Sequence, residues 1–152
     1  MKKEVYIKNE KLQKKLNNLL SDYQIYYQNL RAFHWLVKGP NFYHLHSKFE
    51  EFYTQVNEEI DEVAERILML GGTPLHRFED YLAQASLKAE QNLSRSSEII
   101  PVVIQNSEFL LASFREIADL AGETEDEGST GLMSELISTY EKQLWMLNSL
   151  KE

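Results

Sequence analysis

Residues 33–46 read F-H-W-L-V-K-G-P-N-F-Y-H-L-H and join two long helical patterns through a sharp corner. Glycine suits the left-handed conformation that caps a helix, and proline cannot continue one, so Gly39 and Pro40 predict a helix end. A histidine lies about one helical turn from the corner on either side, His34 before it and His46 after it. We therefore expect a helical hairpin that holds two imidazoles at similar height.

Apolar residues recur at alternating steps of three and four along four segments, which is the spacing of one buried helix face. These seams span residues 12–37, 45–70, 100–120 and 133–147. Asn41 predicts the cap of the second helix and Ser97 that of the third. Pro101 would then lie in a first turn, where its missing N–H removes no hydrogen bond. The stretch G-E-T-E-D-E-G-S-T at 122–130 is expected to separate the last two helices.

The segment between Gly72 and Ser97 is too long for a tight turn between neighbouring helices. The run E-D-Y-L-A within it predicts a short helix. A connection of this length can travel along a bundle, as a ferritin-like topology requires. We therefore expect an all-α, ferritin-like four-helix bundle with a long crossover, carrying a short helix, between the second and third long helices. A plain up-down-up-down bundle is the alternative.

Length and composition narrow the class of protein further. The chain has 152 residues, which suit a single domain over 1–152 with a short flexible tail at 1–8. It has no cysteine, which excludes a disulfide, a thiol nucleophile and a cysteine metal site. The net charge of −8 argues against a general nucleic-acid or acidic-membrane surface. No apolar run is long enough for a signal peptide or a membrane span, so a cytoplasmic protein is expected.

A second, polar series follows the second helix beside its apolar seam. Its steps of three and four keep it in one stripe: His46, Glu50, Tyr53, Asn57, Asp61 and Glu65. His46 with Glu50, and Asp61 with Glu65, have the spacing at which two side chains can reach one ion. A solvated face is the alternative. The stripe, however, is flanked by more apolar residues than a solvated face needs: Phe42, Phe49, Tyr53 and Leu68.

The usual di-iron site inside a four-helix bundle can be tested directly. It needs Glu-x-x-His motifs on two helices. The residues three positions before the four histidines are Arg31, Asn41, Tyr43 and Thr73. No such motif exists in the sequence, so this site is excluded.

The polar stripe can nevertheless form a site between two chains. His46 and Asp61 are fifteen residues apart, or about 22 Å along one helix, whereas metal–ligand bonds are about 2 Å long. If two copies of the second helix pack antiparallel about a two-fold axis near Val56, the histidine end of one lies beside the carboxylate end of the other. Symmetry then makes two equal composite sites. His34 joins the histidine end through the corner.

The run H-W-L-V-K-G-P-N-F-Y-H-L-H-S-K-F-E-E-F-Y, followed by D-E-V-A-E-R-I-L-M-L-G-G-T-P, closely resembles the Dps family of mini-ferritins. The spacing H-x11-H-x3-E-x10-D-x3-E covers 34–65, and the helical layout extends the resemblance over nearly the whole chain. The resemblance implies a dodecameric shell with ferroxidase centres between two-fold-related subunits. Such centres oxidise Fe(II) with hydrogen peroxide, or with O2, and the shell stores ferric mineral.

Carried over to this sequence, the resemblance implies iron ligands from two subunits. These are His34 and His46 from one subunit and Asp61 and Glu65 from its neighbour, and zinc is a competitor for the same site. Glu50 stands where many members have aspartate, and it binds iron either directly or through water. Trp35 resembles the tryptophan near the centre of this family, and it either quenches a stray oxidising equivalent or packs as an interface aromatic.

Other residues support weaker hypotheses. His44 and His76 are expected to be ordinary surface or loop histidines. The acidic run at 123–127 is expected to be a solvated loop, although the family resemblance implies a pore near this region, into which Glu125, Asp126 or Glu127 would draw cations. DNA binding through a lysine-rich N-terminus is the alternative function, carried by Lys2, Lys3, Lys8, Lys11, Lys14 and Lys15, and we favour it less because the chain is acidic. A helical scaffold without chemistry is the third reading.

Overall fold

The computed structural model describes residues 9–150 and contains five helices in that range. They are α1 (Glu10–Leu36), α2 (Phe42–Met69), α3 (Phe78–Gln84), α4 (Ser96–Glu123) and α5 (Glu127–Asn148). The predicted tail at 1–8, with Lys2, Lys3 and Lys8, lies outside the described residues. Among the helices described, none is long and apolar enough to cross a membrane.

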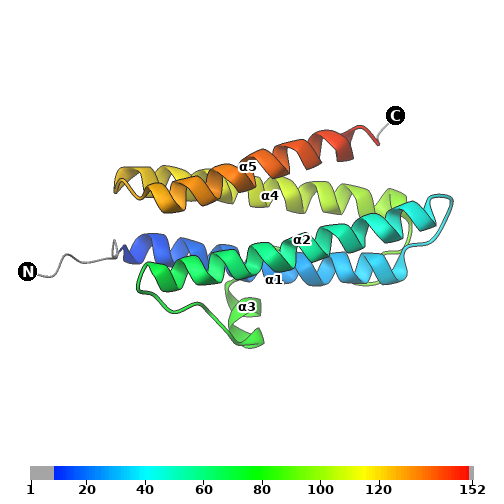
Figure 1. Cartoon of the computed structure of the whole chain (residues 1–152). Coiled ribbons are helices and arrows are strands. Elements are labelled where there is room, and N and C mark those ends of the chain that lie inside the picture. Colours follow the sequence, from blue (N-terminus) through cyan, green and yellow to red (C-terminus); the bar gives the residue numbers. More distant parts are fainter. Residues whose placement is uncertain (1–8, 151–152) are drawn as a thin grey trace, which may run out of the picture.

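Two helical hairpins pack together to form the bundle. Figure 1 shows α1 beside α2 in one hairpin and α4 beside α5 in the other. The crossover returns the chain to the corner at the end of α1, where the Lys38 N–H donates to the Ser94 carbonyl at 2.9 Å. As a result α2 and α4 run in the same direction. The long crossover and the short helix at E-D-Y-L-A are confirmed, and the up-down-up-down alternative is wrong.

Most residues of the predicted seams are buried in the core, and Phe52, Ile60, Ile100 and Ile137 are partly buried against it. All eight residues of the first seam, seven in α1 and Val37 just after it, are almost completely buried: Leu12, Leu16, Leu19, Tyr23, Tyr26, Leu30, Phe33 and Val37. In α2, Val56 and Val63 are buried, but Ile60 is only partly buried and Glu59 occupies the core position beside it. A carboxylate therefore lies inside the bundle where an apolar residue was expected.

The corner between α1 and α2 differs in detail from the prediction. The helix ends at Leu36 and Val37 is already extended, while Gly39 adopts its positive φ of 116° two residues later, in the connecting turn. Asn41 is the N-cap residue of α2, but its side chain makes no capping hydrogen bond. The glycine is therefore needed to turn the chain and does not directly cap α1.

Helices α4 and α5 also begin at other residues than predicted. Arg95 and not Ser97 is the N-cap of α4, so Pro101 is the sixth helical residue, and the bond that its N–H would have made to the Ser97 carbonyl is lost. The expected break at 122–130 is shorter than predicted. Helix α4 continues to Glu123, and α5 begins at Glu127.

Polar side chains of α1 hold the crossover against the bundle. Asn17 donates to the Thr73 carbonyl at 3.2 Å and accepts from the Leu75 N–H at 2.8 Å. Asn29 likewise joins Lys88 and Glu90, and Asp22 accepts from the N–H groups of Ser86 and Leu87 at 2.7 and 2.9 Å. Burial raises the pKa of Asp22 despite these two bonds. The long connection is thus fixed in place and leaves the outer face of α2 uncovered.

Candidate metal centre

His34 and His46 face each other across the corner. Their rings are stacked, with centroids 3.8 Å apart and planes 14° from parallel. Nδ1 of His34 donates to the carbonyl of His46 at 2.6 Å, and Nδ1 of His46 donates to the carbonyl of His34 at 2.7 Å. The expectation that the corner brings the two imidazoles together is confirmed.

The end of α1 explains why this reciprocal pair forms. The His34 carbonyl lies in the last helical turn, and the N–H that would normally bond to it, that of Lys38, bonds instead to Ser94. Nδ1 of His46 donates a hydrogen bond to the His34 carbonyl in its place. The crossover, which occupies the Lys38 N–H, therefore helps to set the orientation of the histidine.

The two hydrogen bonds fix the tautomer of both rings. A carbonyl oxygen only accepts hydrogen bonds, so each Nδ1 must carry the proton. In the neutral imidazole the lone pair is then on Nε2. This second interaction is the type that orients a metal-binding histidine, because it leaves one defined nitrogen for an ion.

Aromatic residues surround the histidine pair. Phe42 stacks on His46, with centroids 5.1 Å apart, and the edge of Tyr53 meets His34 at 5.5 Å. His34 is consequently buried, with 8% of its surface exposed. Trp35, in contrast, is 57% exposed, and the Arg31 guanidinium lies 5.0 Å from its ring. Trp35 is thus available to contact another molecule.

Asp61 and Glu65 lie far from the histidines along the same helix, whereas Glu50 is one helical turn from His46. Glu50, Asp61 and Glu65 are all exposed on α2, which is unbroken from Phe42 to Met69. His46 and Asp61 are therefore about 22 Å apart along the helix axis, as the helical rise predicts. Within residues 9–150, no group of three or more histidine, aspartate or glutamate side chains is arranged to hold a metal ion. Of the predicted ligands, the described part of one chain brings only the two histidines into contact with each other.

A buried carboxylate in the bundle was missed by the sequence reasoning. Glu59 is 5% exposed, and it accepts hydrogen bonds from the Tyr140 hydroxyl and from Nε2 of Gln55, both at 2.7 Å. Burial raises the pKa of Glu59. Its position in the sequence could have predicted this burial. Glu59 is three residues after Val56 and four before Val63, a spacing that places it on the same face of α2 as these two core residues.

Asp126 is not a solvated pore acid, contrary to our expectation for that loop. Its side chain is 2% exposed and forms an ion pair with Arg66 of α2 at 2.8 Å. It also caps α5 by accepting from the backbone N–H of Ser129 at 3.0 Å. Glu125 and Glu127 are exposed. The acidic run therefore includes a residue that joins α2 to α5.

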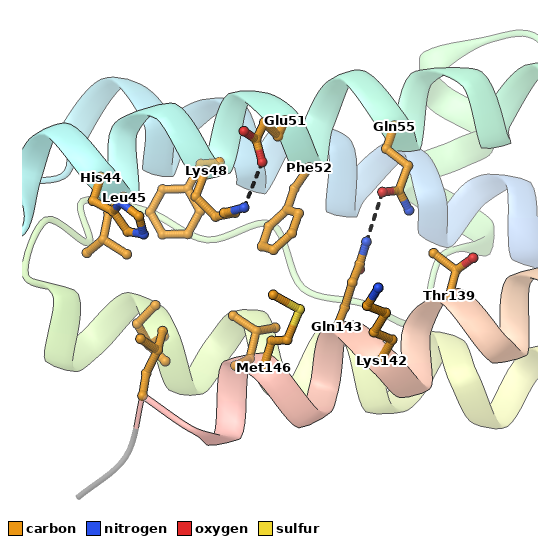
Figure 2. A pocket seen from close by; sticks show the side chains of 14 residues that line it. His44, Leu45, Lys48, Glu51, Phe52, Gln55, Thr139, Lys142, Gln143 and Met146 are labelled. Carbon is orange, nitrogen blue, oxygen red and sulfur yellow. Dashed lines mark hydrogen bonds and ion pairs between the residues drawn. The ribbon is translucent and has the colours of Figure 1, made fainter.

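A pocket of about 420 Å³ opens between α2 and α5, on a different side of α2 from the histidine pair (Figure 2). Its walls are largely apolar, and a hydrogen bond of 2.9 Å from Gln143 to Gln55 crosses between the two helices. His44 lines the pocket, but none of the predicted metal ligands does. His44 and His76 are exposed, as expected for surface and loop histidines.

Comparison with known proteins defines first a class and then a family. The family model described as a ferritin-like domain matches residues 13–152, which places the chain among ferritin-like proteins. A relative from Porphyromonas gingivalis, named DNA protection during starvation protein, is 43% identical over 136 residues, or 90% of this chain and 86% of the relative. The chain belongs to the Dps family.

Solved structures agree with this assignment. The crystal structure of the Dps protein from Vibrio cholerae, described as a member of the ferritin-like diiron-carboxylate superfamily, matches with a TM-score of 0.92 and 43% identity, over 94% of this chain and 90% of that one. Dps from Thermosynechococcus elongatus matches with a TM-score of 0.90 and 32% identity, over 94% and 91% of the two chains. The ferritin-like fold predicted from the sequence is thereby confirmed.

Proposed function

We propose that this Dps-family mini-ferritin is a cytoplasmic ferroxidase and iron store. Two copies pair through α2, and His34 and His46 of one copy bind iron together with Asp61 and Glu65 of the other. Fe(II) is oxidised there with hydrogen peroxide, or with O2, and the ferric product is stored inside a hollow shell, which the family resemblance gives twelve subunits. The observation that carries the proposal is the histidine pair, which leaves both Nε2 atoms for an ion, while residues 9–150 of the same chain hold no group of three or more histidine, aspartate or glutamate side chains that could bind a metal.

The register of α2 supports the pairing. An antiparallel arrangement that sets Glu65 opposite His46 also sets Asp61 opposite Glu50 and Leu68 opposite Tyr43. Leu68 and Tyr43 are 56% and 87% exposed in the single chain, which is unusual for large apolar side chains unless they meet a partner. The Val56 side chain itself is buried in the core, so the proposed axis passes the level of Val56 on the opposite face of the helix, near Thr54 and Asn57.

Charge explains why a cation belongs in this interface. Asp61 opposite Glu50 brings two carboxylates together, and like charges that approach in a partly desolvated interface repel each other. A divalent cation between them removes the repulsion and links the chains. The longer Glu50 reaches the ion directly or through water. Zinc has similar preferences for imidazole and carboxylate and would compete with iron for this site.

The chemistry requires little more from the chain than binding and orientation. The backbone-fixed imidazoles present Nε2 to Fe(II), and the carboxylates offset its charge and that of the Fe(III) product. Two Fe(II) ions give one electron each to hydrogen peroxide, which accepts both electrons and yields two hydroxide ions. Hydroxyl radical is thereby avoided. Trp35, next to His34 and exposed, is positioned either to give an electron to a stray oxidant or to pack against the partner chain.

Replacing both distant carboxylates tests this proposal. Asp61→Ala with Glu65→Ala should abolish fast Fe(II) oxidation while the protein still folds and assembles, measured by absorbance after anaerobic Fe(II) loading and addition of peroxide. The matched control is Glu108→Ala with Asp119→Ala, which removes two exposed acids from α4 and should oxidise Fe(II) at the wild-type rate. An unchanged rate in the Asp61/Glu65 variant would reject the site.

A further inference from the structure

A hydrogen-bonded phenol and carboxylate lie at the centre of the bundle, apart from the proposed iron site. Tyr140 of α5 is 1% exposed, and its hydroxyl donates to Oε2 of Glu59 of α2 at 2.7 Å. The ring of Phe114 of α4 packs edge-on against Tyr140 at 4.9 Å. The phenol is therefore held in one position and is shielded from solvent.

Neighbouring amides fix the carboxylate in the same way. Gln55 uses its oxygen to accept from Gln143 across the pocket of Figure 2 and its nitrogen to donate to Oε1 of Glu59. Oε2 of Glu59 is thus left to face Tyr140. The orientation of the pair is set by contacts from both α2 and α5.

This arrangement is suited to oxidation of the phenol. When a tyrosine loses an electron its hydroxyl becomes strongly acidic, and the proton must go to a base within hydrogen-bond distance. Glu59 is that base and is already in contact with the phenol. Tyr26, another buried tyrosine of the same bundle, instead lies 3.1 Å from the neutral hydroxyl of Ser107. Only Tyr140 among these two has a carboxylate as its acceptor.

The position of the pair connects it to the iron chemistry. Glu59 and Asp61 are two residues apart on α2, which corresponds to about 3 Å along the axis and about 200° around it. Glu59 is buried and Asp61 is exposed, so they point to opposite faces of the same helix. Tyr140 is consequently separated from the Asp61 face by about one helix width, roughly 10 Å.

We propose that Tyr140 and Glu59 form a redox-active pair that donates one electron across α2 to oxidising equivalents generated at the iron site. This inference rests on the proposed ferroxidase function. Its role arises when peroxide meets a site that holds a single Fe(II) ion. Reduction of peroxide needs two electrons, and the single Fe(II) ion gives only one. The pair then supplies the second electron.

The electrons and protons balance over the cycle. One Fe(II) and hydrogen peroxide give Fe(III), hydroxide and a hydroxyl radical. Tyr140 gives one electron, which reduces the hydroxyl radical to hydroxide, and its proton moves to Glu59, leaving a neutral tyrosyl radical beside a neutral carboxylic acid. A later Fe(II) ion returns one electron to the radical while Glu59 returns the proton. The sum is two Fe(II) oxidised per peroxide, as in the two-iron reaction.

The test is electron paramagnetic resonance of the full-length assembled protein. Samples are loaded anaerobically with less than one Fe(II) per site, mixed with peroxide and frozen. We expect a tyrosyl signal that narrows when the protein carries ring-deuterated tyrosine, is lost in Tyr140→Phe, and persists in the matched control Tyr26→Phe. Glu59→Gln keeps a hydrogen-bond acceptor but not a base, so its signal should fall severalfold. A spin trap should capture more hydroxyl radical from Tyr140→Phe than from the wild type.

The outcomes separate this inference from the ferroxidase proposal. An equal tyrosyl signal in Tyr140→Phe and the wild type, or no tyrosyl signal in the wild type, overturns the redox role. Fe(III) formation in the same samples reports on the ferroxidase independently. If no Fe(III) forms, a photochemical one-electron oxidant replaces iron and peroxide, and the same comparison of Tyr140→Phe with Tyr26→Phe decides whether the pair is redox-active. Circular dichroism and size-exclusion chromatography verify that each variant folds and assembles.

Discussion

The ion pair between Arg66 and Asp126 should contribute strongly to stability, because it joins the carboxylate end of α2 to the start of α5. Arg66 Nη2 lies 2.8 Å from Oδ1 of Asp126, and Arg66 Nε donates to the Ser129 hydroxyl at 2.9 Å. We predict that Arg66→Ala lowers the free energy of unfolding by about 3 kcal/mol. Arg66 directly follows Glu65, so the same contact keeps the proposed ligand turn in place.

The magnitude follows from burial. Removing one partner of a buried ion pair costs about 3–5 kcal/mol, because the remaining charge is left without its partner. The Arg66 side chain is 20% exposed, and Asp126 keeps hydrogen bonds from the N–H and hydroxyl of Ser129, which together favour the lower end of the range. For a chain of this size, about 3 kcal/mol lowers Tm by roughly 6–12 °C.

Urea unfolding followed by far-ultraviolet circular dichroism measures this loss. Wild type and variants are compared at one protein concentration, because unfolding of an assembly depends on concentration. The matched control is Arg77→Ala, which removes a bidentate pair with Asp80. The Arg77 side chain is 60% exposed, so its loss should lower stability far less than the loss of Arg66. Equal losses in Arg66→Ala and Arg77→Ala would refute the argument from burial.

Two further predictions concern Glu59 and the N-terminus. Burial raises the pKa of Glu59 above its ordinary value of 4.5, so the folded state retains a proton that the unfolded state loses as the pH rises, and folding becomes less favourable across that interval. The stability of Glu59→Gln relative to wild type should therefore increase between pH 4 and pH 7 in urea titrations; a difference independent of pH contradicts this. For the DNA alternative, the net charge of −8 opposes binding to phosphates, so the full-length protein should give no gel shift at moderate salt. Retardation that disappears on deletion of residues 1–8 would show that the lysine tail dominates.

Periodicity was sufficient to predict the helices and their connection. The α1 seam is buried throughout, and the residues of the G-P-N corner turn the chain so that His34 meets His46. The length of the segment after Gly72 predicted the crossover. These features are encoded locally, in step lengths of three and four and in residues that end helices.

Periodicity could not predict which polar residues are buried in the core. Glu59 and Ile60 are neighbours on α2, and hydrophobicity alone favoured Ile60 as the core residue, although Ile60 is only partly buried and Glu59 is buried. Glu59 is buried because Tyr140 and Gln55 satisfy its oxygens, and these partners come from 81 positions away and from the preceding turn. Asp126 was misread for the same reason, since its partner Arg66 lies 60 positions earlier. Partners that are distant in sequence leave no periodic signal.

The histidine half of the proposed site was predictable, whereas its carboxylate half depends on a second chain. His34 and His46 meet within one hairpin, and their orientation is set by backbone carbonyls. Asp61 and Glu65 lie on the same straight helix, which prevents them from reaching these rings in the same chain. The division of ligands between two chains is therefore a geometrical consequence of an unbroken α2.

Subunit mixing tests this division most directly. One variant carries His34→Ala with His46→Ala, the other carries Asp61→Ala with Glu65→Ala, and each alone should lack fast Fe(II) oxidation. After the two are dissociated together and reassembled in equal amounts, half of the pairs are mixed and each mixed pair contains one intact site. Peroxide-driven Fe(II) oxidation should then recover to about a quarter of the wild-type rate. A mixture as inactive as its components would contradict a site shared between two chains.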